Sequence, residues 1–491
     1  MIRKLMLLAS VAGLAACAAS SEPQVRAERR PNIVVVVADD LGYGDPGAYG
    51  GPIPTPHLDA LAASGARMTQ GYVTAAVCAP SRAGLLAGRH QNRFGFEFNP
   101  AGRDRTQGVP PSERLLPERL KQAGYATGMV GKWHLGMAPG FQPLDQGFDE
   151  FYGLLGGATS YFRVKGPGDE HVPSPEDRYI NRERLPVQDG RRPVDPEGYL
   201  TDVFTDRAVD FVGRNRDRPF FLYLAYTAPH TPLHASAKYA ARFQDVKSPH
   251  TRVYRAMVSS MDDGIGRLRA KLRQEGLEDD TIIVFLSDNG CANYIRGACS
   301  NGSLSGHKAQ PWEGGIRVPY LVSWPGTIRP GVDRQVVSAL DIASTATAVA
   351  GAPGAGLEGR NLVSMLTSRA RQPEPRALFW RTGPNYAVRE GRWKLMVVNK
   401  AATASEGEDV VGQPVEDGVP ARVSPLGQWV MLFDLEADPG EKVDLASRHP
   451  EVVARLQRRW AEWNRANAEP IMTSRRQFNF EVNGRRVELF N

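Results

Sequence analysis

The feature that most constrains the fold of this chain is an uninterrupted apolar run at residues 31–38, PNIVVVVA. A continuous run of mostly β-branched residues is typical of a strand that is buried on both faces of a parallel sheet. Two further apolar runs, at 219–225 (PFFLYLA) and 281–286 (TIIVFL), have the same character. These three segments therefore predict central strands of one parallel sheet.

Helical patterns lie between the predicted strands, at 114–123 and 201–214. Strands that alternate with helices are typical of doubly wound α/β domains. We therefore expect such a domain over residues 31–370, a length that allows a large buried core.

The last part of the chain, residues 371–491, has a different pattern. Short apolar runs separated by turns predict strands at 377–380, 386–389, 393–398 and 429–433. An amphipathic helical pattern follows, with one apolar face made of Val452, Val453, Leu456, Trp460 and Trp463. The stretch 399–425, rich in Gly, Pro and Glu, is expected to be a surface loop. Together these features predict a small antiparallel sheet with a helix, packed on the main domain.

Residues 1–17 have the pattern of a bacterial lipoprotein signal peptide. Arg3 and Lys4 precede an apolar run that is too short to span a membrane and ends in the lipobox-like sequence LAAC. In such signals the final cysteine, here Cys17, is lipidated and becomes the new N-terminus. Residues 18–30 would then tether an exported domain, in the periplasm or anchored to the outer membrane. An ordinary signal peptide cleaved nearby is the alternative.

The distribution of charge along the chain argues against nucleic acid as a partner. The formal net charge is +6 at pH 7, and no basic tail or patch points to nucleic acid. This mildly basic balance permits an anionic substrate without indicating one.

Four cysteines occur in a chain that is expected to meet an oxidising compartment. Cys291 and Cys299 are close enough in sequence to close a small loop as a disulfide. If Cys17 carries the lipid, Cys78 has no partner.

Two of the predicted strands end in oxygen-bearing side chains. Asp39 and Asp40 follow the first apolar run, and Asp288 and Asn289 follow the run at 281–286. Ligands of open α/β sheets bind at the carboxyl ends of the strands. Carboxylate and amide oxygens suit Ca²⁺ or Mg²⁺. Either pair alone is better explained as a turn, but the two together, each after a buried apolar strand, predict a metal site.

The unpaired cysteine lies in the segment VCAPSRAGLLAGRH, residues 77–90. Proline is favoured in the first helical turn, so Pro80 places Cys78 at a helix N-terminus. The free N–H groups and the positive end of the helix dipole favour an anion there. Arg82, one turn further on, is positioned to hold a nucleophile or an oxyanion.

Five motifs spread over nearly the whole mature chain are similar to those of the type I, formylglycine-dependent sulfatases. They are DDLGYGD at 39–45, CAPSR at 78–82, LLAGR at 85–89, GKWHLG at 131–136 and LEADPGE at 435–441. The resemblance implies an alkaline-phosphatase-like fold, with a mixed, mostly parallel sheet sandwiched by helices and a smaller C-terminal antiparallel-sheet-plus-helix subdomain. It also implies hydrolysis of sulfate esters to an alcohol and sulfate, with sulfated carbohydrate as the expected substrate.

In this family a separate maturation enzyme oxidises the cysteine, here Cys78, to formylglycine. One hydroxyl of the aldehyde hydrate attacks sulfur, and deprotonation of the other then expels sulfate, so that no water has to attack the hindered sulfur. One Ca²⁺, or alternatively Mg²⁺, is expected beside residue 78. The implied metal ligands are the group derived from Cys78 together with Asp39, Asp40, Asp288 and Asn289.

The resemblance also assigns supporting residues. Lys132 and His134 match positions that contact the sulfate and the hydrate. His230 matches the histidine that protonates the leaving alkoxide, a proton transfer that suits an ordinary pKa of about 6.5. Lys308 matches the lysine that neutralises the sulfate, and Arg82 adds further positive charge.

Several alternatives remain open at this point. His234 and His307 either line the leaving-group pocket or make local hydrogen bonds. A set of basic residues between 161 and 200 either binds further anionic groups of a glycan or is a solvated loop. The members of this set are Arg163, Lys165, Arg178, Arg182 and Arg184. Phosphonate monoester or phosphodiester hydrolysis is the nearest competing activity, and an inactive surface glycan-binding protein is a further alternative.

Overall fold

A computed structural model describes residues 30–100, 107–173, 186–295, 297–367, 375–402, 413–419 and 421–490. The predicted signal peptide, with Cys17, and all but the last residue of the predicted tether lie outside this set, as do Arg178, Arg182 and Arg184. Among the described helices, none combines the length and apolar character needed to cross a bilayer.

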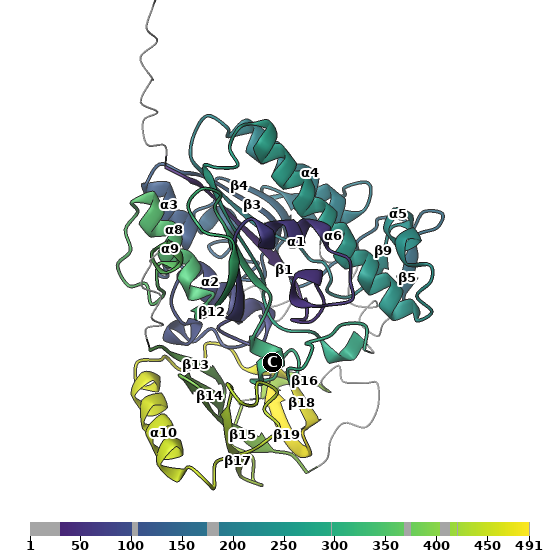
Figure 1. Cartoon of the computed structure of the whole chain (residues 1–491). Coiled ribbons are helices and arrows are strands. Elements are labelled where there is room, and N and C mark those ends of the chain that lie inside the picture. The colour runs from purple at the N-terminus through teal and green to yellow at the C-terminus, as the bar shows by residue number, and fades with distance from the viewer. Residues whose placement is uncertain are drawn as a thin grey trace, which may run out of the picture.

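The larger of the two main sheets has ten strands in the order β12-β2-β11-β10-β1-β8-β3-β4-β6-β7 (Figure 1). Their bounds are β1 Asn32–Ala38, β2 Ala66–Tyr72, β3 Ala126–Lys132, β4 Glu150–Leu154, β6 Val187–Asp189, β7 Arg192–Val194, β8 Phe220–Ala225, β10 Thr281–Ser287, β11 Tyr320–Ser323 and β12 Gly331–Ser338. The central neighbours β10, β1, β8, β3 and β4 are all parallel, whereas β11 pairs antiparallel with both β10 and β2. The sheet is therefore mixed and mostly parallel, as predicted.

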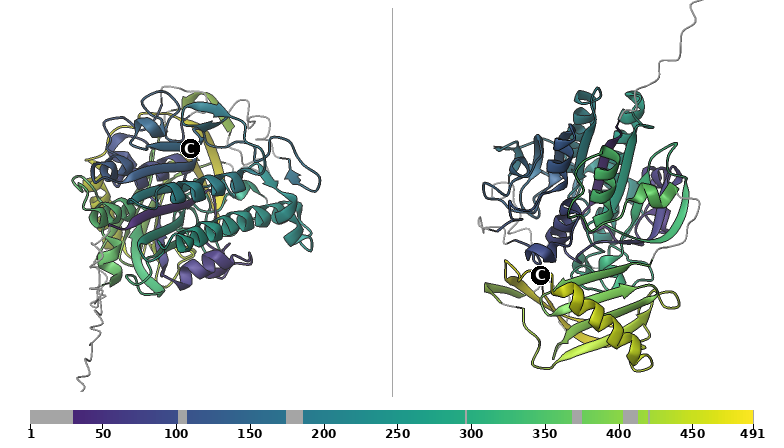
Figure 2. Two further views of the ribbon diagram at one scale, coloured as in Figure 1. Left: turned by 90° about the horizontal axis from the view of Figure 1, so that it is seen from above. Right: turned by 90° about the vertical axis from the view of Figure 1, so that its left-hand side faces the viewer.

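The alternating side chains of β1 enter two separate hydrophobic cores. Val35 and Val37 pack in the core that also holds buried residues of α2 (Cys78–Ala87), α3 (Leu116–Gln122) and α8 (Leu340–Ala350). Val34 and Val36 pack in the core on the other face, beneath α4 (Leu200–Arg214) and α6 (Pro249–Gln274). Figures 1 and 2 show these two helical layers with the sheet between them. Burial on both faces explains why the β1 sequence is continuously apolar from Ile33 to Ala38.

A second, smaller sheet is formed by the C-terminal part of the chain and lies below the first in Figure 1. Its order is β13-β14-β15-β19-β18-β16, with β17 also paired to β15, and the pairs are antiparallel. The bounds are β13 Ala377–Thr382, β14 Asn385–Glu390, β15 Trp393–Lys400, β16 Gln413–Val419, β17 Gln428–Asp434, β18 Ser474–Val482 and β19 Arg485–Phe490. Helix α10 (Pro450–Asn464) packs on this sheet through Leu456. The predicted fold class is confirmed, while the boundary at 370/371 falls outside the described residues and stays a prediction.

The expectation of a surface loop over 399–425 is wrong for part of that stretch. Residues 413–419 form β16, which pairs with β18. The polar, Gly- and Pro-containing sequence of β16 carries no strand pattern of its own. Pairing with the C-terminal β18–β19 hairpin, some sixty residues further along the chain, determines its conformation instead.

Candidate active site

The two acidic strand ends lie side by side at one edge of the large sheet. Strands β1 and β10 run in register, with Ala38 opposite Ser287, so the residues that follow each strand emerge at the same level. The backbone N–H of Asp288 donates to Ala38 O at 3.0 Å, and that of Asp40 donates to Asp288 Oδ1 at 3.2 Å. Asp40 has φ +68°, a left-handed conformation that is uncommon for a residue with a side chain. The pairing of the strands thus brings the predicted metal-ligand residues together.

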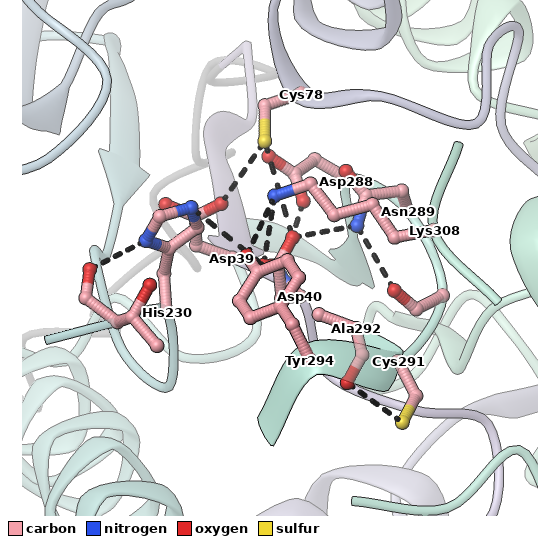
Figure 3. Close-up of polar contacts among 12 residues, drawn as sticks. Asp39, Asp40, Cys78, His230, Asp288, Asn289, Cys291, Ala292, Tyr294 and Lys308 are labelled. Atoms are coloured by element: carbon pink, nitrogen blue, oxygen red, sulfur yellow. Dashed lines mark hydrogen bonds and ion pairs between the residues drawn. The ribbon is translucent and has the colours of Figure 1, made fainter. Parts of the chain in front are cut away.

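Cys78 is the first residue of α2, as its sequence context predicts. Its Sγ lies 3.5 Å from Asp39 Oδ1 and 3.9 Å from Asp40 Oδ1 (Figure 3). Cys78 is buried, and it is the one free cysteine among the described residues. Burial raises the pKa of its thiol well above the ordinary value, and the neighbouring lysines only partly offset this effect. The side chain is therefore a neutral thiol at physiological pH.

Arg82 lies one helical turn after Cys78 and binds a carboxylate. Its Nε and Nη2 both lie 2.8 Å from Asp288 Oδ2, and its Nη1 donates to Lys132 O at 2.9 Å. Burial and the charge of Asp39 raise the pKa of Asp288 to about 6, against the opposing effect of Arg82. In this geometry Arg82 orients Asp288, whereas the sequence predicts a contact with the nucleophile or an oxyanion.

Lys132 and His134 occupy the end of β3 and the turn after it. Lys132 Nζ lies 2.6 Å from Asp39 Oδ2, and both side chains are buried. His134 adopts φ +63°, and its Nδ1 is buried without a hydrogen-bond partner. A side-chain carbon at Gly157 would lie 2.7 Å from His134 Nε2, so any larger residue there would require the imidazole to shift. Burial and the nearby positive charges lower the pKa of His134 well below its ordinary value, so this imidazole is neutral.

Four polar groups converge on the carboxylate of Asp40 (Figure 3). Its Oδ2 lies 2.8 Å from Lys308 Nζ, 3.0 Å from Tyr294 Oη and 3.6 Å from His230 Nε2. Its Oδ1 accepts from Asn289 Nδ2 at 2.7 Å. Burial alone would raise the pKa of Asp40, but the positive charges, led by Lys308, outweigh burial and hold it below the ordinary value.

His230 belongs to the loop that follows β8. Its Nδ1 lies 2.6 Å from Thr231 O, which fixes the proton of the neutral ring on Nδ1 and leaves Nε2 facing the site. The hydroxyl of Tyr161, whose side chain is buried, donates to the carbonyl oxygens of Thr227 and His230. Tyr161 therefore stabilises the backbone of the loop that carries His230.

The donor atoms fit a hard divalent cation. Asn289 Oδ1 is buried and has no hydrogen-bond partner, although its Nδ2 is satisfied by Asp40 Oδ1 and Gly290 O. An orphaned buried amide oxygen costs about 1–3 kcal/mol, a penalty that a bound cation removes. Ligand atoms of Asp39, Asp40, Cys78 and His230 also lie within 4.8 Å of one another. Asp39, Asp40, Cys78 and Asn289 are ligands that the sequence predicts, whereas His230 is predicted as a general acid; together they form a candidate metal site.

Tyr294 is a site residue that the sequence analysis missed. It lies in a short 3-10 helix, Asn293–Ile295, within a loop closed by the disulfide between Cys291 and Cys299. The disulfide confirms the pairing that the short spacing of these two cysteines predicts. The only sequence signal for Tyr294 is its position five residues after Asn289, which does not reveal which side chain turns inward.

The two uncertain histidines lie in different settings. His234 stacks on Phe162 at 5.4 Å and meets His171 edge-on at 4.4 Å, within an aromatic cluster. His307, next to Lys308, has its pKa lowered by burial. Arg163 forms an exposed ion pair with Asp195, which matches the solvated-loop alternative for that residue.

Comparisons with known proteins agree with this geometry. The sulfatase family model matches residues 31–352, and a model of the C-terminal region of aryl-sulfatase matches residues 372–481. Human arylsulfatase A is 34% identical over 480 residues, which cover 92% of this chain and 89% of that protein. Human N-acetylgalactosamine-6-sulfatase is 34% identical over 460 residues, which cover 88% and 84% respectively.

Solved structures give the same result at the level of the fold. The crystal structure of Ps i-CgsB in complex with k-i-k-neocarrahexaose superposes with a TM-score of 0.77 at 32% identity, covering 91% of this chain and 95% of that one. A phosphonate monoester hydrolase from Silicibacter pomeroyi superposes with a TM-score of 0.60 at 18% identity, covering 90% and 96%. The latter similarity extends to the fold alone.

Proposed function

Because the chain belongs to the sulfatase family and is thus a sulfuric ester hydrolase, we propose that it desulfates carbohydrates through a formylglycine derived from Cys78. One divalent cation, Ca²⁺ with Mg²⁺ as the alternative, would lie beside that residue. The observation that carries the proposal is the setting of Cys78. A buried thiol with a raised pKa, facing two carboxylates, is a poor nucleophile, and conversion to an aldehyde accounts for its position.

The hydrate of formylglycine supplies a nucleophilic hydroxyl and a second hydroxyl whose deprotonation releases sulfate. Asp39, Asp40, Asp288 and Asn289 would hold the cation, Asn289 through its unpartnered Oδ1. When bound, the cation supplies positive charge that neutralises the sulfate and activates the hydroxyl. Arg82 holds Asp288 in place through its two contacts to Oδ2.

Two lysines are placed to bind the anionic sulfate. In the structure, Lys132 Nζ lies 2.6 Å from Asp39 Oδ2 and Lys308 Nζ lies 2.8 Å from Asp40 Oδ2. Both side chains are buried, so their charges act with little screening by water. Fixed positive charges that are aimed at the reacting group are a major source of catalysis in such sites.

His230 is the proposed general acid. Its Nδ1–H donates to Thr231 O, so the proton that the imidazolium form transfers is the second one, on Nε2, the atom that faces Asp40. A proton donated from Nε2 to the departing alcohol oxygen avoids the release of an unstable alkoxide. His134, neutral and buried beside Lys132, accepts or donates hydrogen bonds without adding charge.

The carbohydrate substrate is supported by the named ligand of Ps i-CgsB and by the similarity to N-acetylgalactosamine-6-sulfatase. We test it by measuring sulfate release from a panel of sulfated algal and animal glycans. The enzyme is produced together with a formylglycine-generating maturation enzyme, and the Cys78→Ala variant is the matched control. Faster turnover of an aryl phosphodiester than of an aryl sulfate would favour the competing phosphodiesterase activity instead.

The proposed location is that of an exported bacterial lipoprotein, in the periplasm or anchored to the outer membrane. The support is the sequence of residues 1–17, with its charged start, short apolar run and lipobox-like end. We expect the full chain to partition with membranes and the Cys17→Ala variant to lose lipid labelling. Equal labelling of both proteins would contradict the assignment.

A further inference from the structure

A fully buried charged triad links the C-terminal sheet to the catalytic part of the chain. Lys394 Nζ, in β15, lies 3.0 Å from Glu313 Oε1 and 2.7 Å from Glu441 Oε1. All three residues are 0% exposed. Glu313 begins the short helix α7 (Glu313–Ile316), and Glu441 follows β17. Replacement of buried ion pairs by apolar side chains of similar volume is often neutral or stabilising, so stability is a weak reason for three charges here.

The triad adjoins the segment 305–313, which we call the lysine loop because it carries Lys308. The backbone N–H of Lys308 donates to Cys291 O at 2.9 Å. The next residue, Ala309, donates to Ala76 O at 2.7 Å, two residues before Cys78. Ala309 has φ +68°, a conformation that a residue with a side chain seldom adopts unless its surroundings impose it. Hydrogen bonds to Cys291 and Ala76 thus hold the lysine loop in a specific conformation.

Both ends of the lysine loop are tied to the C-terminal part of the chain. At its far end, the N–H of Glu313 donates to Glu441 Oε2 at 2.6 Å. At its near end, Ser305 Oγ donates to Gly440 O at 2.5 Å. Asn483 Nδ2 joins the two ends, since it donates to Glu441 O at 2.9 Å and to Ser305 Oγ at 3.1 Å.

Glu313 also connects this arrangement to the strand that leads to Cys78. The hydroxyl of Tyr72, the last residue of β2, donates to Glu313 Oε2 at 2.6 Å. Gly290, next to Asn289, donates its N–H to Gly315 O at 3.0 Å, within α7. The triad therefore contacts β2, which precedes Cys78, and it adjoins α7, whose Gly315 contacts the residue next to Asn289.

We propose that Lys394 and Glu441 are positioning residues, which hold the lysine loop so that Lys308 reaches the reacting sulfate. The inference rests on the proposed function, in which Lys308 binds that group. Glu441 holds the backbone of the loop, and Lys394 keeps the carboxylates of Glu441 and Glu313 in one place. The catalytic geometry depends in this way on residues outside the large sheet.

The decisive variants alter the contacts through which Lys394, Glu441 and Asn483 hold the lysine loop. We call these contacts the clamp, and none of them involves the substrate. Glu441→Ala removes the acceptor of the Glu313 N–H, whereas Glu441→Gln keeps an oxygen there. Asn483→Gly, at a position with φ +50°, removes only the bridging amide and leaves the buried triad intact. Arg392→Ala is the matched control, because it breaks a half-exposed ion pair with Asp434 only two residues from Lys394.

We expect Glu441→Ala to lower kcat/KM by about ten- to a hundredfold, the cost of misplacing a catalytic group. The Ki of inorganic sulfate as an inhibitor should rise in the same variant, and amides of residues 305–314 should exchange with deuterium at least about tenfold faster. Glu441→Gln should recover most of the activity, Asn483→Gly should change all three readouts by about threefold, and Arg392→Ala should change none.

The proposal is overturned if folded Glu441→Ala keeps kcat/KM and sulfate inhibition within twofold of wild type. If that variant does not fold, wild-type kinetics and wild-type exchange of residues 305–314 in Asn483→Gly overturn it equally. Absence of sulfatase activity in the wild-type enzyme would instead count against the proposed function. The exchange measurement still tests the clamp in that case, because it requires no turnover.

Discussion

The Sγ of Cys78 lies 3.5 Å from Asp39 Oδ1, so the thiol directly faces a residue of the candidate metal site. A second carboxylate, that of Asp40, lies 3.9 Å from the same sulfur. Burial and negative neighbours oppose formation of a thiolate, which is the reactive form of cysteine. The hydrate that we propose at residue 78 instead presents neutral hydroxyl groups to these oxygens.

We expect Cys78→Ala to reduce sulfatase turnover by at least about a thousandfold, as removal of a nucleophile does in other hydrolases. The melting temperature should stay close to that of wild type, because alanine fits the same helix start. Activity, thermal unfolding and mass spectrometry of the peptide that spans residue 78 form the measurement. Wild-type turnover by the variant, or fully active wild-type protein that contains only unmodified cysteine, would refute the nucleophile assignment.

Removal of the cation should abolish activity and lower thermal stability together. Asp288→Ala deletes one of the proposed ligands and also leaves buried Arg82 without its main partner, so both metal content and turnover should fall. Chelation of wild type should give the same loss, reversed by added Ca²⁺, which raises the melting temperature through binding to the folded state. Asp206→Asn, which alters an exposed ion pair with Arg267, is the control. Turnover that survives both chelation and Asp288→Ala would remove the metal from the mechanism.

Mutation of His230 should affect substrates according to their leaving groups. His230→Ala is expected to lower kcat for sugar sulfates by about a hundred- to ten-thousandfold, the usual contribution of a general acid. Nitrophenyl sulfate should be affected far less, because nitrophenolate departs without protonation. His449→Ala, at a half-exposed histidine paired with Glu451, should leave both rates unchanged. Equal losses on both substrates would assign His230 a role other than proton donation.

Opening the Cys291–Cys299 disulfide should weaken substrate binding more than it slows the chemical step. The loop that it closes carries Tyr294, whose hydroxyl lies 3.0 Å from Asp40 Oδ2 and 3.3 Å from Lys308 Nζ. In a Cys291→Ser/Cys299→Ser double variant we expect KM to rise several-fold with kcat within about twofold. Tyr294→Phe, which keeps the disulfide, shows how much of that change comes from the hydroxyl. A large fall in kcat with unchanged KM would contradict the prediction.

The parts of the site that the sequence predicts are those encoded locally. The apolar run of β1 is followed directly by Asp39 and Asp40, and Pro80 marks the first turn of α2, which starts at Cys78. Each of these signals lies within a few residues of the group that it positions. The central strands of the large sheet are predictable for the same reason, because burial on both faces leaves a continuous apolar run.

The parts that could not be predicted depend on contacts between distant segments. Strand β16 exists because β18 pairs with it, and Lys394 meets Glu313 across 81 residues of chain. A lysine and a glutamate read from sequence are most often solvated, and only the fold shows that these are fully buried. The partner of Arg82 is likewise visible only in the fold: its motif suggests contact with the nucleophile, but its side chain binds Asp288.

The stability of the fold should fall in mildly acidic solution through His90. This residue is buried, its Nδ1 lacks a hydrogen-bond partner, and its ring meets Trp463 edge-on at 5.1 Å. Burial lowers its pKa to about 4, against an opposing effect of Glu358, whereas an unfolded chain has a pKa of about 6.5. A lowered pKa in the folded state gives a stability contribution that is complete above pH 6.5 and is lost as the pH falls toward 4.

The expected loss from His90 between pH 7.5 and pH 5 is about 2 kcal/mol of unfolding free energy. His90→Phe keeps an aromatic ring against Trp463 and cannot be protonated, so its loss over this range should be smaller by that amount. Urea unfolding at the two pH values measures the difference, in which groups that titrate alike in both proteins cancel. His449→Phe, at a half-exposed position, should retain the wild-type pH dependence. Identical pH dependence in His90→Phe and wild type would show that His90 is not the group responsible.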